Sequence, residues 1–283
     1  MALVTMKEML KDARENKYAV GMFDVHNMEM VRAVVEAAEQ EQAPVIMALA
    51  EGHVHSKNDI EEISNIMVYA AKKTKQPVAV HYDHGMHMEY IVQVLKCGFS
   101  SVMYDGSLLP FEENVRNTKE VVRLANLFDA SVEAEIGHVG QGEDGVEDGS
   151  EMEYTKPEDA KRFVEETNVD ALAVAIGTIH GVYRERPTLD LERLHVIYRT
   201  VDVPLVLHGG SGLSDKEFRD CIDNGISKVN IYTEIVQTAM KEIHADITNK
   251  RQSTYPQLMR QSVDAMRENI TAHIRLFGSS HKA

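Results

Sequence analysis

The sequence predicts one (β/α)8 barrel, an α/β fold that takes in residues 1–283 as a single domain with additional helices at the C-terminal end. Short β-rich runs alternate with longer segments of helical period, and no Pro/Gly/Ser-rich linker interrupts them. This alternation is typical of βαβ units around a parallel sheet. Eight strands in roughly 210 residues fit a barrel of typical size. A doubly wound sheet is the main alternative, but it normally has a glycine-rich loop after its first strand. Here residues 24–27 contain no glycine.

The expected strands are runs of aliphatic and β-branched residues, and amphipathic segments separate them. The first 17 residues have a helical pattern, and so does the end of the chain, from Glu234 to about Leu276. The eight expected strands are 19–25, 44–50, 77–83, 100–105, 130–136, 170–176, 203–209 and 227–232, and the amphipathic segments between them include 28–42, 60–74 and 111–128.

Charge and composition exclude several classes of protein. The chain has 30 Lys and Arg against 45 Asp and Glu, a formal net charge of −15. So acidic a chain is a poor candidate for nonspecific nucleic-acid binding, and an anionic membrane surface would repel it. No apolar run approaches the ~20 residues that span a bilayer, and the charged N-terminus does not resemble a signal peptide. Cys97 and Cys221 form no CxxC motif and are expected to stay reduced, which fits a cytoplasmic protein.

Polar side chains stand at or near the end of every expected strand. In a barrel the carboxyl ends of the strands form the active site, so this convergence predicts an enzyme. The residues are Asp24, Asn27, Glu51, Asp83, His84, Asp105, Glu135, His180, His208 and Asn230.

Three of these residues, His84, His180 and His208, are expected to end the third, sixth and seventh strands. Three histidines with an open fourth position are a typical catalytic zinc arrangement. A single histidine would more often cap its strand, but three at one barrel mouth favour a metal. Asp83 is then either an acid/base group or support for a ligand, and its alternative is a plain turn residue.

Two glycine-rich segments are expected to serve the same site. The run 208–212 follows the seventh strand and 230–233 ends the eighth, which is where barrels of this kind often bind phosphate. Gly177 and Gly181 could extend this cradle, although most such runs are ordinary turns. The acidic stretch 137–150 is expected to be a mobile active-site loop that carries Glu143, or else a solvated acidic loop.

These residues belong to motifs that resemble the class II, zinc-dependent ketose-bisphosphate aldolases. The resemblance is to the shorter branch of the family, with the fructose- and tagatose-bisphosphate aldolases. The motifs run in family order from Phe23 almost to the C-terminus: HYDHG, SVMYDGS, VEAEIGHVGQGEDGV, AVAIGTIHG, PLVLHGGSGL, KVNIYTE and LFGSS.

The resemblance implies reversible cleavage of a ketose 1,6-bisphosphate to dihydroxyacetone phosphate and an aldehyde such as glyceraldehyde 3-phosphate. Zn2+ would be held by His84, His180 and His208. Asp105 and Glu135 would hold a second or displaced divalent ion, and a monovalent cation, Na+ or K+, would assist phosphate binding. Asp83 would handle the C4 hydroxyl proton, and Glu143 would protonate the enediolate. The expected substrate-binding residues are Asn27, Gly181, Gly209, Gly210, Ser211, Asn230, Ile231, Tyr232 and Thr233.

The chain departs from the family pattern at several positions. Asp24 replaces the usual Asn, Ala50 replaces a Ser or Thr, and Tyr232 replaces a small or acidic residue. The usual Asp-Pro-Arg near the C-terminus is missing, although Arg260 is close in sequence. The alternative substrate is therefore a ketose phosphate that lacks the distal phosphate. The family also implies a homodimer or homotetramer.

Two other functions compete with an aldolase. A different metal-dependent barrel enzyme, such as a hydrolase, could use the same three histidines. A sugar-phosphate sensor without activity would fit the changes at Asp24, Ala50 and Tyr232. Asp83, Glu143 and all three histidines are present, which favours the aldolase.

Overall fold

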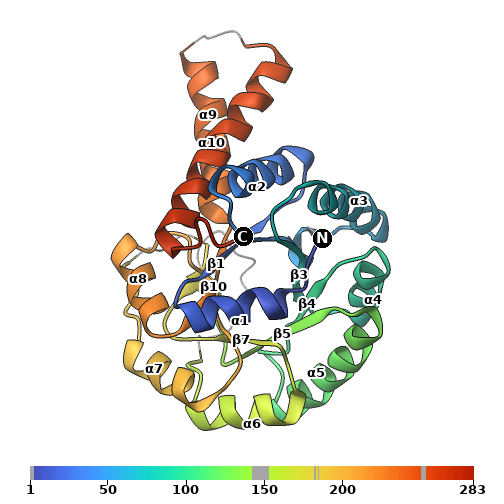
Figure 1. The fold of residues 1–283 in the computed structure, drawn as a ribbon, viewed down its shortest axis with the longest axis vertical. Helices are drawn as coiled ribbons and strands as arrows, with labels where there is room; N and C mark the ends of the chain where they lie inside the picture. Colours follow the sequence, from blue (N-terminus) through green and yellow to red (C-terminus); the bar gives the residue numbers. More distant parts are fainter. Residues whose placement is uncertain (1–2, 142–152, 182, 184, 250–252) are drawn as a thin grey trace.

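The computed structural model describes residues 3–141, 153–181, 183, 185–249 and 253–283. Its main feature is a closed barrel of parallel strands, in the spatial order β1-β10-β9-β7-β5-β4-β3-β2 (Figure 1). All eight expected strands form, so the predicted (β/α)8 barrel is confirmed. The barrel strands are β1 (Val20–Asp24), β2 (Val45–Ala50), β3 (Val78–Gly85), β4 (Ser101–Tyr104), β5 (Ser131–Ile136), β7 (Ala171–Val174), β9 (Leu205–Leu207) and β10 (Ile226–Ile231).

Helices surround the barrel, and several begin at a side-chain cap (Figure 1). Ser56 and Ser214 each form a capping box, in which the serine hydroxyl accepts from a backbone N–H and a carboxylate accepts from the serine N–H. The helices are α1 (Met6–Asn16), α2 (Met28–Glu41), α3 (Lys57–Lys73), α4 (Met88–Lys96), α5 (Phe111–Ala125), α6 (Pro157–Thr167), α7 (Leu191–Thr200), α8 (Asp215–Asp223), α9 (Thr233–Thr248) and α10 (Tyr255–Phe277), with short 3-10 turns η1 (Glu51–His53) and η2 (Asn126–Phe128).

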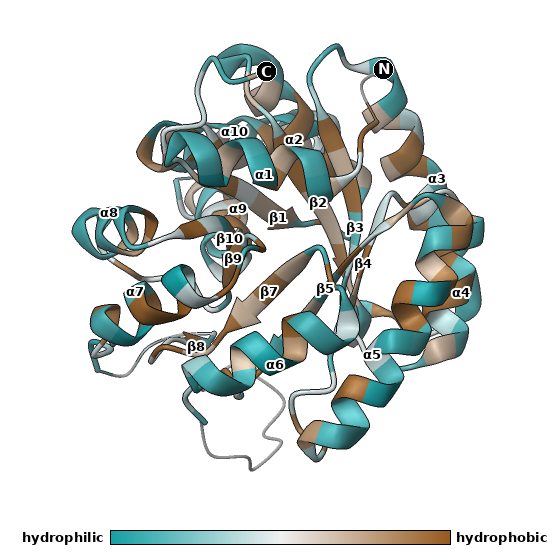
Figure 2. Cartoon of the chain, turned by 60° about the horizontal axis from the view of Figure 1, so that its bottom comes forward, coloured by the Kyte–Doolittle hydropathy of each residue, from teal (hydrophilic) through white to brown (hydrophobic). Residues whose placement is uncertain are grey.

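Two apolar cores hold the barrel together. The larger one fills the layer between the strands and the surrounding helices, which carry a hydrophobic and a hydrophilic side (Figure 2). The smaller one joins α1 to the barrel interior, where Met6 and Leu10 pack in one cluster with Met22 and Val206. The backbone N–H of Met6 also donates to Ser131 Oγ at 3.1 Å. The amino-terminal end of the barrel is thus closed by α1, and the opposite end is left for a site.

A small extra sheet was not predicted. β6 (Gly140–Gln141) pairs in parallel with β8 (Ile179–His180) beyond the carboxyl ends of the barrel strands. His180 therefore lies on β8, and the prediction that it ends the sixth barrel strand was wrong. The chain turns between β7 and β8 at Gly177, which has φ 115° and would bring a Cβ within 2.4 Å of the Thr188 carbonyl oxygen. The first part of the expected loop 137–150 is ordered as β6, and residues 142–150, Glu143 among them, lie outside the described residues.

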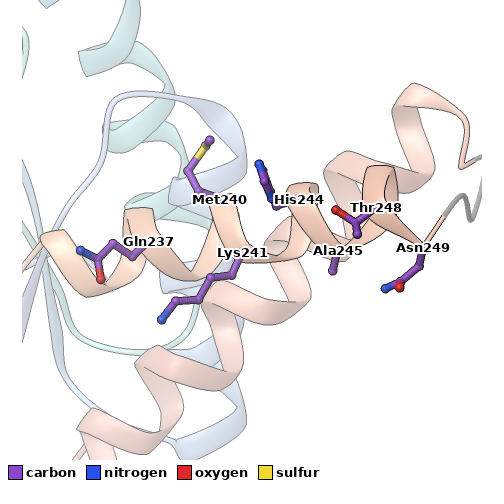
Figure 3. A pocket seen from close by; sticks show the side chains of 7 residues that line it. All are labelled: Gln237, Met240, Lys241, His244, Ala245, Thr248 and Asn249. Atoms are coloured by element: carbon purple, nitrogen blue, oxygen red, sulfur yellow. The ribbon is translucent and has the colours of Figure 1, made fainter.

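The last two helices form a hairpin that projects from the barrel (Figure 1). α10 packs against both α2 and α9. A shallow hollow lies along α9, and Figure 3 shows the side chains that line it, from Gln237 to Asn249. Among the described residues, no helix combines the length and the apolar character needed to cross a membrane.

Candidate active site

Three imidazole rings meet at the carboxyl end of the barrel. His84 lies near the end of β3, His180 on β8, and His208 directly after β9. The Nε2 atom of His84 is 3.0 Å from Nδ1 of His208, and one ring nitrogen from each of the three lies within 4.8 Å of the others. Neither nitrogen of His180 has a hydrogen-bond partner in the described part of the chain. Burial and the two other histidines hold its pKa well below the usual range, so its ring is neutral. Three ring nitrogens that converge on one point fit a zinc ion.

Carboxylates orient two of these rings from behind. Asp105 Oδ2 lies 2.7 Å from His84 Nδ1, and Glu133 Oε1 lies 2.9 Å from His208 Nε2. Each contact uses the ring nitrogen that faces away from the shared point, so the other nitrogen of each ring faces that point. Carboxylate–histidine pairs of this kind fix the tautomer and orientation of metal ligands.

Glu135 and Asp105 form a second donor set with His84. Glu135 Oε1 accepts from the Val139 N–H at 3.0 Å, while its buried Oε2 has no partner among the described residues. Burial and the neighbouring charge of Asp105 raise the pKa of Glu135 to about 8. A cation at this position would offset the free-energy cost of keeping Glu135 ionised while it is buried next to Asp105. These carboxylates therefore fit a second or displaced divalent ion.

Asp83 is a buried carboxylate beside the histidines. Its Oδ2 atom lies 3.7 Å from His84 Nε2 and accepts from Asn230 Nδ2 at 3.4 Å, and Oδ1 lies 3.5 Å from His81 Nε2. Burial alone would raise the pKa of Asp83, but the charge of His84 and the contact with His81 hold it well below its usual value. The opposite holds for Asp24, whose pKa is raised well above its usual value by burial and by the charge of Asp83. The pKa values of two neighbouring carboxyl groups are thus shifted in opposite directions, as in many acid/base sites.

The glycine-rich segments build one wall of the site from backbone. Gly209 has φ 65°, and a Cβ there would lie 2.3 Å from the Ile179 carbonyl oxygen. A Cβ at Gly210 would lie 2.9 Å from the Asn230 carbonyl oxygen. Ser211 Oγ accepts from the Tyr232 N–H at 3.3 Å, next to the first turn of α9. This wall therefore combines close backbone packing with a helix N-terminus, an arrangement that suits an anion.

Comparison with known proteins agrees with this geometry. The model of the family "Fructose-bisphosphate aldolase class-II" matches residues 4–282. The chain belongs to this class II aldolase family. It is therefore an aldolase, a carbon–carbon lyase, and the family acts on sugar phosphates.

Similar aldolases carry different substrate names. A 6-phospho-5-dehydro-2-deoxy-D-gluconate aldolase from Halalkalibacterium halodurans is 41% identical over 286 residues, which cover 100% of this chain and 99% of that protein. A fructose-bisphosphate aldolase from Staphylococcus aureus is 38% identical over 287 residues, with 100% of both chains covered. The crystal structure of the YdjI aldolase from Escherichia coli K12 matches with a TM-score of 0.88 and 38% identity, over 99% of each chain.

The predicted site residues of the aldolase divide into three groups. The first group comes together around the shared point and consists of His84, His180, His208, Asp83, Asp105 and Glu135. The second group lines the adjoining wall or lies next to it in the chain, and it consists of Gly209, Gly210, Ser211, Asn230 and Tyr232, with Gly181, Ile231 and Thr233 beside them. The third group, Asn27 and Glu143, is not placed at the site. Asn27 is exposed, and its side chain caps α2 by accepting from the Met30 N–H at 2.9 Å. Its contact with substrate stays a prediction. Glu143 falls outside the described residues.

Three residues of the aldolase site were missed because only strand ends were considered. Lys228 Nζ lies 2.8 Å from Glu133 Oε2, and both side chains are fully buried. His81 is buried beside them and contacts Ser101 Oγ at 2.8 Å. Each stands two positions before a predicted residue, as Glu133 does before Glu135. Strand residues two apart share a face, so this spacing was the signal for a deeper layer of the site.

Proposed function

We propose that this aldolase uses Zn2+ to cleave a ketose phosphate reversibly into dihydroxyacetone phosphate and an aldehyde. The observation that carries the proposal is the convergence of His84, His180 and His208 beside the ionised Asp83. These three histidines would hold the zinc ion. When bound there, it would act as a Lewis acid and stabilise the negative charge that develops on the C2 carbonyl oxygen and on a neighbouring hydroxyl oxygen of the substrate.

The proton transfers are assigned to side chains of the protein. Asp83 accepts the C4 hydroxyl proton as the C3–C4 bond breaks and C4 becomes the aldehyde carbonyl. The electron pair of that bond stays on the three-carbon fragment as an enediolate. Protonation of its carbon, assigned to Glu143, then gives dihydroxyacetone phosphate. In condensation both proton transfers run in reverse. Asn230 holds Asp83 in place through the 3.4 Å contact between its amide nitrogen and Oδ2.

The phosphate of the dihydroxyacetone half is assigned to the glycine-rich wall. Backbone groups would come from Gly181, Gly209 and Gly210, and a hydroxyl group from Ser211. The N-terminus of α9 would be added by residues 230–233. This explains how a chain of net charge −15 can bind a phosphate. A monovalent cation, Na+ or K+, would supplement these dipoles.

Two substrate classes compete. A fructose- or tagatose-type 1,6-bisphosphate was the first expectation, and a ketose phosphate without the distal phosphate was the second. The position of Arg260 favours the second class, because its guanidinium is already engaged with two carboxylates. It lies 2.7 Å from both oxygens of Glu36 and 2.6 Å from Asp264 Oδ1. We therefore do not assign to Arg260 the role of the missing arginine of the family pattern.

Assembly and location are also proposed. A homodimer or homotetramer is supported by the projecting hairpin, which exposes Met240, Ile247 and Tyr255. Light scattering on the purified protein tests this assembly. A cytoplasmic location is supported by the two free cysteines.

The function is tested by metal removal and by proton exchange. Treatment with EDTA should abolish release of dihydroxyacetone phosphate from a ketose phosphate, and added Zn2+ should restore it. The enzyme should also exchange a hydroxymethyl proton of dihydroxyacetone phosphate with solvent, which neither a hydrolase nor a sensor would do. Full turnover after complete zinc removal, or zinc-loaded protein without any exchange, would refute the proposal.

A further inference from the structure

Three side chains that the proposed mechanism does not use form a cluster at the barrel mouth. His26 follows β1, His53 ends the short turn after β2, and Tyr232 follows β10. Because β1 lies between β10 and β2 in the barrel, these three loops are neighbours. The ring of His26 is 4.4 Å from that of His53 and 5.3 Å from that of Tyr232, and the last two are 4.8 Å apart. The Tyr232 hydroxyl also lies 3.1 Å from His26 Nε2.

The cluster holds polar atoms that lack partners. His26 Nδ1 and His53 Nδ1 are both buried, and neither has a hydrogen-bond partner among the described residues. Asp24 Oδ1, in the same part of the mouth, is buried as well and has no hydrogen-bond partner in the described ranges. Buried polar groups are normally hydrogen-bonded, so several unpaired ones in one place point to a ligand. When the Tyr232 hydroxyl donates to His26 Nε2, the imidazole proton stands on Nδ1 and can be donated to such a ligand.

The cluster is on the aldehyde side of the site. Asp83 handles the C4 hydroxyl, so substrate atoms beyond C4 must extend past it. His53 is near enough to Asp83 for the charge of that carboxylate to raise the pKa of His53 against the larger, opposite effect of burial. Asp24 likewise contributes to the raised pKa of Tyr232, after the larger effect of burial. Tyr232 is also two residues from Asn230, whose amide contacts Asp83. The dihydroxyacetone phosphate half is assigned to the glycine-rich wall, to which Tyr232 contributes only its backbone N–H. The Tyr232 side chain and the two imidazoles are thus left for the other half.

The cluster offers hydrogen bonds without a fixed positive charge. No Lys or Arg is a partner of these three side chains in the part of the chain that the structure describes. Burial, with the neighbouring His53, lowers the pKa of His26 to about 4, and burial lowers that of His53 too. Both rings are therefore neutral near pH 7. A phosphate dianion placed here would be desolvated near the Asp83 carboxylate, without a Lys or Arg partner from the described residues at these three rings.

We infer that His26, His53 and Tyr232 form the subsite for the aldehyde half of the substrate and select an aldehyde without a phosphate. The inference rests on the proposed aldol reaction. The shared chemistry of the selected aldehydes is a terminal oxygen, of a hydroxyl or a carboxylate, that accepts a hydrogen bond from an imidazole N–H. These residues would be the specificity determinants that take the place of the missing arginine.

The test is a condensation assay with the full-length zinc enzyme, dihydroxyacetone phosphate and three aldehydes. They are D-glyceraldehyde 3-phosphate, D-glyceraldehyde, and a three-carbon aldehyde that ends in a carboxylate. We expect at least one unphosphorylated aldehyde to have a kcat/KM about tenfold or more above that of the phosphorylated one. The two unphosphorylated arms distinguish a hydroxyl from a carboxylate. A higher kcat/KM for glyceraldehyde 3-phosphate than for both others would overturn the inference.

Variants tie the preference to the cluster. Tyr232→Phe and His53→Asn should each raise the KM for the preferred aldehyde about tenfold, the value of one net hydrogen bond, with zinc content unchanged. His55→Asn is the matched control, because His55 is exposed two positions away. An unchanged aldehyde KM in both cluster variants would also overturn the inference. Proton exchange by the wild-type enzyme separates the two failures: no exchange refutes the aldol reaction itself, whereas exchange with a preference for the phosphorylated aldehyde refutes only the subsite.

Discussion

Glu133 Oε1 contacts His208 Nε2 at 2.9 Å, and both side chains are fully buried in the barrel. The other carboxylate oxygen of Glu133 pairs with Lys228 at 2.8 Å. The charge of Lys228 and the contacts with His208 and His81 hold the pKa of Glu133 at about 2, against the effect of burial. Glu133 therefore stays ionised and connects a metal ligand to a buried cation.

Glu133→Gln should weaken zinc binding about 10-fold or more, because the carboxylate that supports His208 loses its charge. It should also destabilise the protein by about 3–5 kcal/mol, because Lys228 is left buried without a counter-ion. Competition with a chromogenic chelator measures the first effect and urea unfolding the second. The double variant with Lys228→Met should regain stability but not zinc affinity. Recovery of both in the double variant would contradict a direct role for Glu133 at His208.

Asp83→Ala should lower the cleavage rate at least about 100-fold, the usual contribution of a general base. Zinc content should stay the same, because the three histidines supply the proposed ligands. Steady-state release of dihydroxyacetone phosphate and elemental analysis of the same sample measure the two quantities. Turnover close to wild type would remove Asp83 from the mechanism.

Asp24→Asn should preserve activity and increase stability at high pH. The pKa of Asp24 is raised in the folded protein, so between its unfolded value, about 4, and its folded value the folded state binds more protons. The contribution of Asp24 to stability is thus present at low pH and is lost as pH rises through the folded pKa. Asparagine stays neutral at every pH. Urea unfolding with saturating zinc measures this at pH 5 and pH 8. The free energy of unfolding of the variant, relative to the wild type, should be more favourable at pH 8 than at pH 5. An equal change at both values would mean that Asp24 is not protonated in the folded state.

Gly209→Ala should destabilise the protein by more than about 1 kcal/mol and weaken zinc binding. Its φ of 65° disfavours a side chain, and the added Cβ would lie 2.3 Å from a carbonyl oxygen of β8, the strand that carries His180. Gly52→Ala is the matched control, because a Cβ there meets nothing within 4 Å. Thermal unfolding and chelator competition compare the two. Equal behaviour of the two variants would show that the loop adapts.

Local pattern was sufficient for the architecture and for most donors of the proposed metal site. Strand–helix alternation predicted the eight strands, because buried parallel strands are continuous apolar runs. Residues at the strand ends then converge by barrel geometry alone. The position of His180 on β8 could not be predicted, since two-residue strands have no periodic signal. The helix-capping role of Asn27 was not predicted, although an Asn at a strand end is also a common helix cap.

By itself the sequence determined the alternation of strands and helices that predicts the barrel, and the adjacency of Asp83 and His84 in HYDHG, because each depends on residues close together in the chain. The tertiary structure alone decided which ring nitrogens face one another, in which direction the pKa of each buried carboxyl is shifted, and that His26, His53 and Tyr232 lie together. Those properties depend on burial and on polar or charged groups brought together from distant parts of the chain, such as Glu133 with Lys228 and His26 with Tyr232. Electrostatic energies vary with distance and local dielectric, and neither quantity can be read along the chain.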